Sequence, residues 1–258
     1  LLAVWIFSVP SNDRDWQDEV RRLVTVEPGK GDAVMLHNIR NWSYAPDGST
    51  TQEVWIDRVL RISDLKQAWF VVEPFWGNPA IAHTMFAFEF ADGSAYVVSI
   101  EARKEVGERY RPLRATLLPT YEYMLVWATE RDMYANSEFV TENSLYLYRL
   151  AIPLGQQQAL LRAMTGKTAE LAEHPRWYNT VFANCTNVLA RVVNDLQPGT
   201  VPFDISWVLP GYSDSFLHRL GYFGPDQDFE ALERAAYLSP FIRPAYAETD
   251  PARFSQLL

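Results

Sequence analysis

The chain of 258 residues contains a single cysteine and four histidines, which limits its possible chemistry. One cysteine excludes an internal disulfide framework and any zinc site built from several thiolates. His37, His174 and His218 are scattered without metal-ligand spacing, and the chain has no G-x-G-x-x-G, P-loop or G-x-S-x-G motif. We therefore expect no metal and no cofactor, and neither a nucleotide site nor a serine-hydrolase site.

Positive charge is also scarce. The 23 Lys and Arg residues are outnumbered by 32 Asp and Glu residues, which gives a formal net charge of −9. A protein that binds nucleic acid needs a basic face to neutralise phosphates. The composition therefore argues against a nucleic-acid partner.

Long apolar runs are rare as well. The most apolar stretch, residues 1–10, is shorter than the ~20 residues that a membrane-spanning helix needs. It changes abruptly into a polar run at Ser11, and Trp5 and Trp16 flank the change, which is typical of a membrane exit. We interpret residues 1–10 as the end of a segment that anchors the protein in the inner membrane, in preference to an N-terminal strand or a packed tail.

The apolar residues that are present, 48% of the chain with 14% aromatic, suffice for a sizeable core and exclude disorder. Strand-like patterns come first, and helical patterns follow. We expect an α+β fold with an antiparallel sheet packed against the helix that carries the cysteine, residues 11–200 forming one domain and residues 201–258 a helical and loop extension packed on it. The expected strands lie at 33–36, 52–60, 67–73, 81–90, 96–103, 121–128 and 145–152, and the expected helices at 15–24, 156–173 and 185–196.

Residues 81–90 and 96–103 predict a hairpin whose register follows from side-chain alternation. The even-numbered positions of both segments are apolar, so they should share one face of the sheet. A three-residue loop, Ala91-Asp92-Gly93, meets this requirement and gives Gly93 the left-handed position that such loops need. The remaining positions then form a more polar face.

In that register His83 lies directly across from Glu101, with Ser99 and Arg103 on the same face. A carboxylate beside an imidazole fixes its tautomer and stabilises the imidazolium, as a general base requires. The alternative is a cross-strand ion pair on a solvated sheet face.

Cys185 follows Asn184, a good N-cap, and therefore lies in the first turn of a helix. There the helix dipole and the unpaired N–H groups lower the thiol pKa, and the same groups can hold an oxyanion. The alternative is a buried cysteine that only fills the core. If this helix crosses the polar face of the hairpin, Cys185 meets His83 with Glu101 behind it.

Several short motifs follow one another along the chain: GNPAIAHT at 77–84, SIEARKEVGE at 99–108, ERD at 130–132, LYLYRL at 145–150, WYN at 177–179 and NCT at 184–186. In this order they resemble the Lnb N-terminal periplasmic domain family of bacterial envelope proteins, over roughly residues 12–200. The resemblance implies a Gram-negative periplasm and a core similar to circularly permuted papain-like (NlpC-type) thiol enzymes, in which the histidine precedes the cysteine.

The resemblance also implies that Cys185 is the nucleophile and His83 the base, whereas Glu101 as the orienting residue comes from the register. Asn184 and Tyr178 are candidate helpers of the Cys185 N–H in holding an oxyanion. Ser99 and Arg103 are candidate positioning residues beside the His–Glu pair.

Together these features predict a membrane-tethered periplasmic acyltransferase or hydrolase that forms a thioester and acts on an acyl ester or amide of a phospholipid or lipoprotein. Two alternatives stay open. The same three residues would serve a cysteine peptidase or amidase of peptidoglycan, and an unreactive Cys185 would fit a non-catalytic binding module of the envelope.

Overall fold

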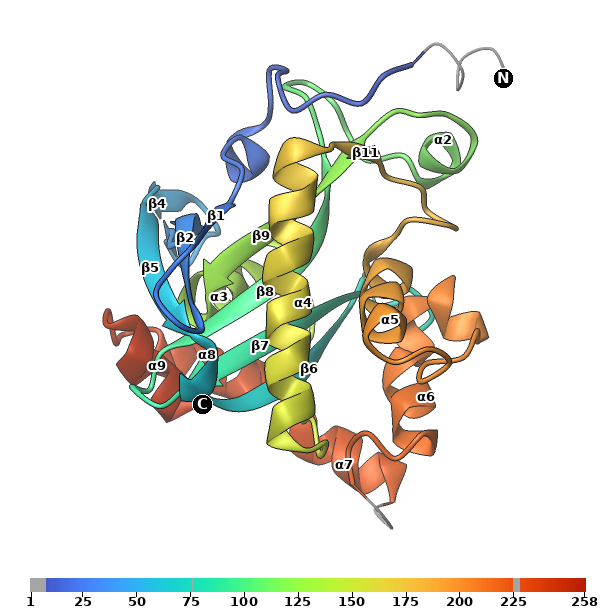
Figure 1. Ribbon diagram of the computed structural model, residues 1–258. Helices are drawn as coiled ribbons and strands as arrows, with labels where there is room; N and C mark the ends of the chain where they lie inside the picture. Colours follow the sequence, from blue (N-terminus) through green and yellow to red (C-terminus); the bar gives the residue numbers. More distant parts are fainter. Residues whose placement is uncertain (1–7, 76, 225–227) are drawn as a thin grey trace.

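A nine-stranded sheet runs through the centre of the computed structural model, which describes residues 8–75, 77–224 and 228–258 (Figure 1). The strands lie in the order β1-β2-β9-β8-β7-β6-β10, with β5 beside β2 and β11 beside β9. The described pairs are antiparallel, apart from the short parallel contact of β2 with β9. The strands of this sheet are β1 (Thr25–Pro28), β2 (Ala33–Arg40), β5 (Trp55–Arg61), β6 (Leu65–Pro74), β7 (Ala82–Phe90), β8 (Ala95–Arg103), β9 (Glu122–Thr129), β10 (Tyr146–Arg149) and β11 (Arg176–Trp177).

Two long helices and several short ones surround the sheet. The α-helices are α2 (Pro112–Leu117), α3 (Glu130–Ala135), α4 (Leu154–Glu173), α5 (Cys185–Leu196), α6 (Ser213–Arg219), α7 (Phe229–Ala236), α8 (Ser239–Ala245) and α9 (Pro251–Leu257). Short helical turns are η1 (Asp18–Val20), η2 (Ile62–Asp64), η3 (Asn136–Val140), η4 (Ile205–Trp207) and η5 (Pro210–Tyr212), and β3 (Ser43–Tyr44) pairs with β4 (Thr50–Gln52). The predicted α+β fold with a mostly antiparallel sheet is confirmed.

The hairpin of β7 and β8 has the register that the alternation predicted. The N–H of Phe90 donates to the carbonyl of Ser94 across the three-residue loop, and Gly93 has a φ of 84°. The paired residues run from the loop to Met85 opposite Ser99. His83 and Glu101 follow directly beyond this last pair.

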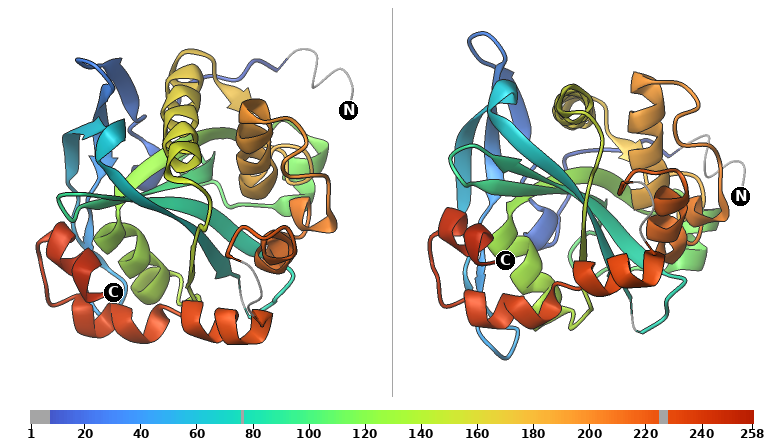
Figure 2. Two further views of the ribbon diagram at one scale, coloured as in Figure 1. Left: turned by 60° about the horizontal axis from the view of Figure 1, so that its bottom comes forward. Right: turned by 90° about the horizontal axis from the view of Figure 1, so that it is seen from below.

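Both faces of the hairpin are buried, although the sequence pattern predicted one apolar face and one more polar face. The even-numbered face, with Phe86, Phe88 and Val98, packs against α4 and α5. The odd-numbered face, with Met85 and Val97, packs against α3, α8 and α9. Figure 2 shows the resulting three layers, with α4 and α5 on one side of the sheet and the C-terminal helices on the other. The interpretation of the His–Glu pair as part of a solvated sheet face is therefore wrong.

The expected helix at 15–24 is absent from the structure, which has only the short turn η1 in this segment. The carbonyl groups of Val20 and Arg21 accept hydrogen bonds of 2.9 Å from the guanidinium of Arg103. These carbonyl groups are therefore not available for hydrogen bonds within a helix. Packing along β8 stabilises the segment more than a helix would.

The predicted membrane anchor falls mostly on residues 1–7, which lie outside the described residues. Within the described part of the chain, no helix combines the length and the apolar character needed to cross a bilayer.

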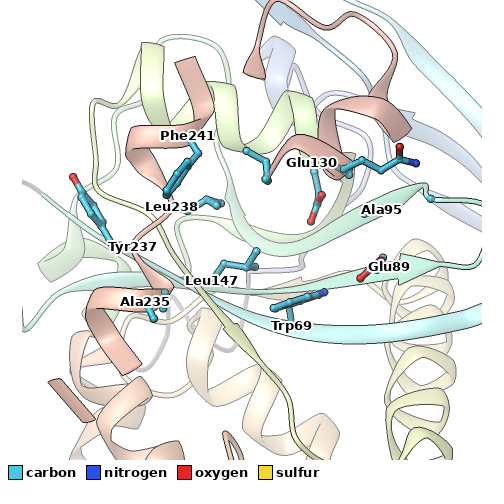
Figure 3. A pocket seen from close by; sticks show the side chains of 14 residues that line it. Trp69, Glu89, Ala95, Glu130, Leu147, Ala235, Tyr237, Leu238 and Phe241 are labelled. Atoms are coloured by element: carbon cyan, nitrogen blue, oxygen red, sulfur yellow. The ribbon is translucent and has the colours of Figure 1, made fainter. Parts of the chain in front are cut away.

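The C-terminal helices cover the odd-numbered face and enclose a cavity of about 230 Å³ between themselves and the sheet (Figure 3). The carboxyl group of Glu130 points into this cavity and accepts a hydrogen bond of 2.9 Å from the hydroxyl of Tyr134. Burial raises the pKa of Glu130 to about 7, against smaller opposing effects of hydrogen bonds from Ser255 and Tyr134.

This buried carboxyl makes stability depend on pH. A folded pKa above the unfolded one means that the folded state holds its proton longer, so stability falls as the pH rises from about 4.5 to about 7. We expect Glu130→Gln to stabilise the protein at pH 8 by on the order of 2 kcal/mol, with no gain at pH 4. Urea denaturation of both proteins at pH 4 and pH 8 measures the change in the free energy of unfolding. An equal change at the two pH values would contradict the prediction.

Candidate active site

His83 lies at the beginning of β7, where its ring is held by two polar side chains of β8. Its Nε2 is 3.1 Å from Oε1 of Glu101 and also contacts the hydroxyl of Ser99. Because the Ser99 hydroxyl donates to Glu101, its oxygen is left to accept from the imidazole, so Nε2 carries a proton. Nδ1 is then the nitrogen available to the thiol of Cys185.

Cys185 is the first residue of α5, and its position is set by the cap before it. The side chain of Asn184 accepts from the N–H of Asn187, and the side chain of Asn187 accepts from the N–H of Asn184, in a reciprocal capping box with distances of 2.9 and 3.0 Å. Val188 and Leu189 of the same helix lie in the core between α5 and the sheet. The cap and this apolar stripe fix both where the helix begins and how it is turned.

The helix approaches the sheet from the face opposite to the one that the sequence suggested. Thr186 contacts Thr84 at 2.9 Å, and Thr84 belongs to the even-numbered face, whereas His83 belongs to the odd-numbered one. The two catalytic candidates still meet because the described β7–β8 pairs end at Met85. Beyond that point the sulfur reaches the backbone of β7, 4.0 Å from the carbonyl of Ala82, and interacts with His83.

The electrostatics of the site favour a thiolate. Burial raises the pKa of Cys185, but the positive charge of His83, a hydrogen bond with His83 and hydrogen bonds from Thr84 outweigh it, so the pKa lies below its ordinary value of 9.0. Burial lowers the pKa of His83, and the charges of Glu101 and Cys185 more than offset this, so its pKa lies well above 6.5. Both shifts favour the charged forms, a thiolate beside an imidazolium.

Two carboxylates flank the imidazole, one from each neighbouring strand. Burial raises the pKa of Glu101, whereas the charge of His83 and hydrogen bonds from His83 and Ser99 lower it, with a net pKa of about 2. Glu73 lies opposite His83 on β6 and accepts hydrogen bonds from Thr141 and Asn143 at 2.9 and 3.0 Å. Burial raises the pKa of Glu73 despite the nearby charge of His83. Glu101 is therefore the ionised partner of the histidine.

Cys185, His83 and Glu101 share a cavity of about 450 Å³ whose walls are mainly apolar and aromatic. Cys185 and His83 are only 5% and 9% exposed, so their reactive atoms lie inside the protein rather than on its surface. The other residues that line the cavity are Phe75, Ile81, Ala82, Ile100, Ala102, Lys104, Tyr110, Pro112, Tyr178, Thr180, Asn184, Val208, Leu209 and Pro210.

Two other sequence candidates lie in the cavity wall. Tyr178 is buried there and packs edge-on against Tyr110 at 5.9 Å. The amide of Asn184 donates to the carbonyls of Thr180 and Trp207 at 2.9 and 2.8 Å, while its oxygen caps the helix. Both side-chain N–H groups of Asn184 are therefore engaged by backbone carbonyls, and its expected role as an oxyanion donor stays a prediction.

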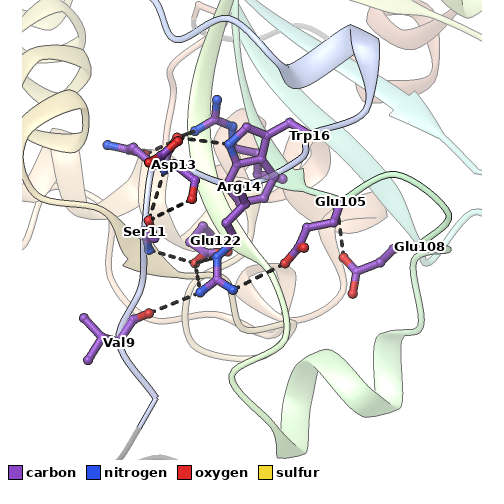
Figure 4. Close-up of polar contacts among 10 residues, drawn as sticks. Val9, Ser11, Asp13, Arg14, Trp16, Glu105, Glu108 and Glu122 are labelled. Carbon is purple, nitrogen blue, oxygen red and sulfur yellow. Dashed lines mark hydrogen bonds and ion pairs between the residues drawn. The ribbon is translucent and has the colours of Figure 1, made fainter.

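The structure places Arg103, expected as a positioning residue, outside the cavity. Its side chain is 1% exposed, contacts the carbonyls of the N-terminal segment and stacks on Trp16 at 4.2 Å. It fastens that segment to β8, together with the network of Arg14, Glu105 and Glu122 (Figure 4).

Sequence reasoning missed Glu73, which lies beside His83, and Tyr110 and residues 208–210, which line the cavity. No motif marks them, because their place at the site depends on how the strands pair and how the loops fold back. Among the described residues, no group of three or more His, Cys, Asp or Glu side chains is placed to hold a metal ion.

The family model of the Lnb N-terminal periplasmic domain matches residues 51–211, which include every residue of the cavity. The chain belongs to this family. The match begins and ends later in the chain than the resemblance seen in the sequence motifs, which covered roughly residues 12–200. Membership supports a periplasmic location for this Lnb N-terminal domain. The chain matches no curated protein and no solved structure.

The electrostatic coupling of Cys185, His83 and Glu101 in this Lnb N-terminal domain predicts that Glu101 controls thiol reactivity. Without the carboxylate the pKa of His83 falls and that of Cys185 rises toward its ordinary value, so less thiolate is present at neutral pH. We expect Glu101→Gln to slow iodoacetamide alkylation of Cys185 several-fold at pH 7 and to move the alkylation profile to higher pH. Glu105→Gln, which removes a more exposed carboxylate, is the matched control, and an unchanged profile in Glu101→Gln would rule out this coupling.

Gly211 of η5 supports the segment that leads into His83. A Cβ at this position would lie 1.7 Å from the carbonyl oxygen of Pro79, and the N–H of Gly211 donates to Ala80. We expect Gly211→Ala to push residues 79–81 away and to lower thiol reactivity. Gly155→Ala, where a Cβ meets no neighbouring atom, is the control, and equal alkylation rates in the two variants would contradict the expectation.

Proposed function

We propose that this domain is a cysteine-dependent acyltransferase or hydrolase that acts on an acyl ester or amide of a lipid or lipoprotein. The observation that carries the proposal is the Cys185–His83–Glu101 constellation on the wall of an apolar cavity. A thiolate beside an imidazolium that a carboxylate orients is the arrangement of a nucleophilic thiol enzyme.

In the first step the sulfur of Cys185 attacks the acyl carbonyl carbon. A carbon–sulfur bond forms, and the bond from the carbonyl carbon to the leaving oxygen or nitrogen breaks. His83 gives its Nδ1 proton to the leaving group, which departs as an alcohol or amine. Glu101 holds the ring through Nε2 and stabilises the imidazolium until the proton is transferred.

In the second step the thioester passes its acyl group to an amine or to water. Neutral His83 takes the proton of the attacking group, the new acyl bond forms and the carbon–sulfur bond breaks. The electron pair returns to sulfur, and the thiolate–imidazolium pair is restored.

The backbone N–H of Cys185 is the proposed donor to the oxyanion of each tetrahedral intermediate. It belongs to the first turn of α5, where N–H groups have no acceptor within the helix and the dipole favours negative charge. Because the side-chain N–H groups of Asn184 donate to backbone carbonyls, Tyr178 in the cavity wall is the proposed second contributor.

The lining of the cavity favours an acyl chain over a peptidoglycan fragment. Phe75, Ile100, Tyr110, Val208 and Leu209 offer the apolar surface that a hydrocarbon chain buries, whereas a sugar–peptide needs many hydrogen-bonding partners. Phospholipid or lipoprotein is therefore the substrate class that we propose.

We also propose that the domain is a circularly permuted papain-like core tethered to the inner membrane by residues 1–10. In support, the histidine comes from a sheet that precedes the cysteine helix in the chain, and the helix begins at the cysteine. A tether would raise the local concentration of a lipid substrate.

The nucleophile is tested by Cys185→Ala and Cys185→Ser. We expect both to abolish turnover of a phospholipid or diacylated lipopeptide and to change the free energy of unfolding by only on the order of 1 kcal/mol. Mass spectrometry of the wild-type protein with the substrate should show an added acyl group on Cys185 that hydroxylamine removes.

The assay is run in parallel with muropeptides. Turnover of muropeptides alone would replace the lipid proposal by a peptidoglycan amidase or peptidase. A Cys185 that resists iodoacetamide at neutral pH, together with no turnover of either substrate, would indicate a binding module instead.

A further inference from the structure

Exposed apolar side chains lie along the segments that border the cavity. Ile81 lines the cavity, and the others lie within a few residues of lining residues in the chain; their exposed fractions range from 38% to 76%. Isolated apolar residues on a surface are ordinary, but a cluster around a cavity indicates an interaction site. We call these residues the apolar rim: Ile81, Leu113, Leu117, Phe182, Phe203 and Ile205.

Hydrogen bonds join the segments of the apolar rim into one border. The Thr180 hydroxyl donates to the carbonyl of Pro112 at 2.9 Å, and the Asn179 amide donates to the carbonyl of Thr116 at 3.0 Å, so the loop before α5 is fastened along α2. On its other side, the Asn184 amide donates to the carbonyl of Trp207 in η4 at 2.8 Å. Figure 1 shows α2 and α5 on the same side of α4.

Positive charge accompanies the apolar rim, although the protein as a whole carries a net charge of −9. Arg109, Arg111 and Arg114 are exposed in and before α2, next to Leu113 and Leu117. Basic residues beside inserted apolar side chains are the pattern of a surface that binds anionic lipid headgroups.

The two glutamates of the same loop are turned toward the protein. Glu105 pairs with Arg14 at 3.4 Å, and the carboxylate of Glu108 accepts from the N–H of Glu105 at 3.0 Å (Figure 4). Their negative charge is therefore partly compensated, while the arginines remain exposed to solvent.

The N-terminal segment is fixed beside the same loop. Gln17 donates to the carbonyls of Glu105 and Glu108 at 3.1 and 2.7 Å, and Arg14 donates to the carbonyl of Val9 at 3.2 Å. Val9 is thus held on the side of α2, and the apolar residues 1–7 precede it in the sequence.

We propose that the apolar rim and the three arginines dock the domain on the surface of an anionic lipid bilayer, with the cavity mouth facing the membrane. The apolar rim would enter the interface while the arginines contact lipid phosphates. A second copy of the chain fits less well, because a two-fold interface over this surface would bring the two arginine clusters together. Docking goes beyond the proposed function and does not require Cys185 to react.

Sedimentation of the full chain with vesicles tests the docking, using phosphatidylcholine alone and phosphatidylcholine mixed with phosphatidylglycerol. We expect the triple change Leu113→Ser, Leu117→Ser and Phe182→Ser to weaken binding to the mixed vesicles about tenfold or more. The matched control changes exposed apolar residues elsewhere, Val59→Ser, Val140→Ser and Phe241→Ser, and should bind within about twofold of the wild type.

The charge contribution is tested separately. Replacing Arg109, Arg111 and Arg114 by Gln should remove the preference for the anionic vesicles, and high salt should do the same. The control replaces three arginines that are exposed elsewhere, Arg61, Arg149 and Arg234, and should keep the preference. Circular dichroism verifies that each variant is folded.

Equal vesicle binding by the rim variant and its control would overturn the proposal. Light scattering that shows a dimer in the wild type and a monomer in the rim variant, without vesicle binding, would assign the apolar rim to self-association. Cys185→Ala separates the two proposals, because it should bind vesicles like the wild type while losing turnover.

Discussion

The candidate site depends on one buried electrostatic interaction, that between the sulfur of Cys185 and the imidazole of His83. Burial favours the neutral form of both groups, whereas their mutual charge, with Glu101 behind the ring, favours a thiolate beside an imidazolium. The interaction needs a helix that begins at the cysteine and a hairpin that opens at the histidine. The capping box of Asn184 supplies the first, and the end of the β7–β8 pairing at Met85 supplies the second.

The three-layer architecture explains why Cys185 and His83 are sheltered from water. Helices cover both faces of the sheet, so the end of the hairpin lies between α5, η5 and the loop before α2 instead of on an open face. The same packing surrounds the thiol with apolar walls. A thiol in such a cavity suits the acyl substrate that we propose, and the proposed docking of the apolar rim would turn the cavity mouth toward a membrane.

Several parts of the fold could be read from the sequence because they are local. The alternation of β7 and β8, the three-residue loop with Gly93 and the cap at Asn184 are each decided within a few residues, and the structure has all three. The prediction of a helix at 15–24 was wrong because a distant contact decides the conformation of this segment. Its carbonyls bind Arg103, a residue that lies far away in the chain.

The sequence by itself determined the family, the hairpin register and the identity of the cysteine, histidine and glutamate that lie together, since short-range pattern and motif order carry that information. Only the tertiary structure decided that α5 packs on the apolar face, that backbone carbonyls engage the Asn184 amide and that Arg103 anchors the N-terminal segment. The face that a helix chooses and the partners that a polar group finds depend on elements distant in the chain. The local sequence pattern therefore does not predict these contacts.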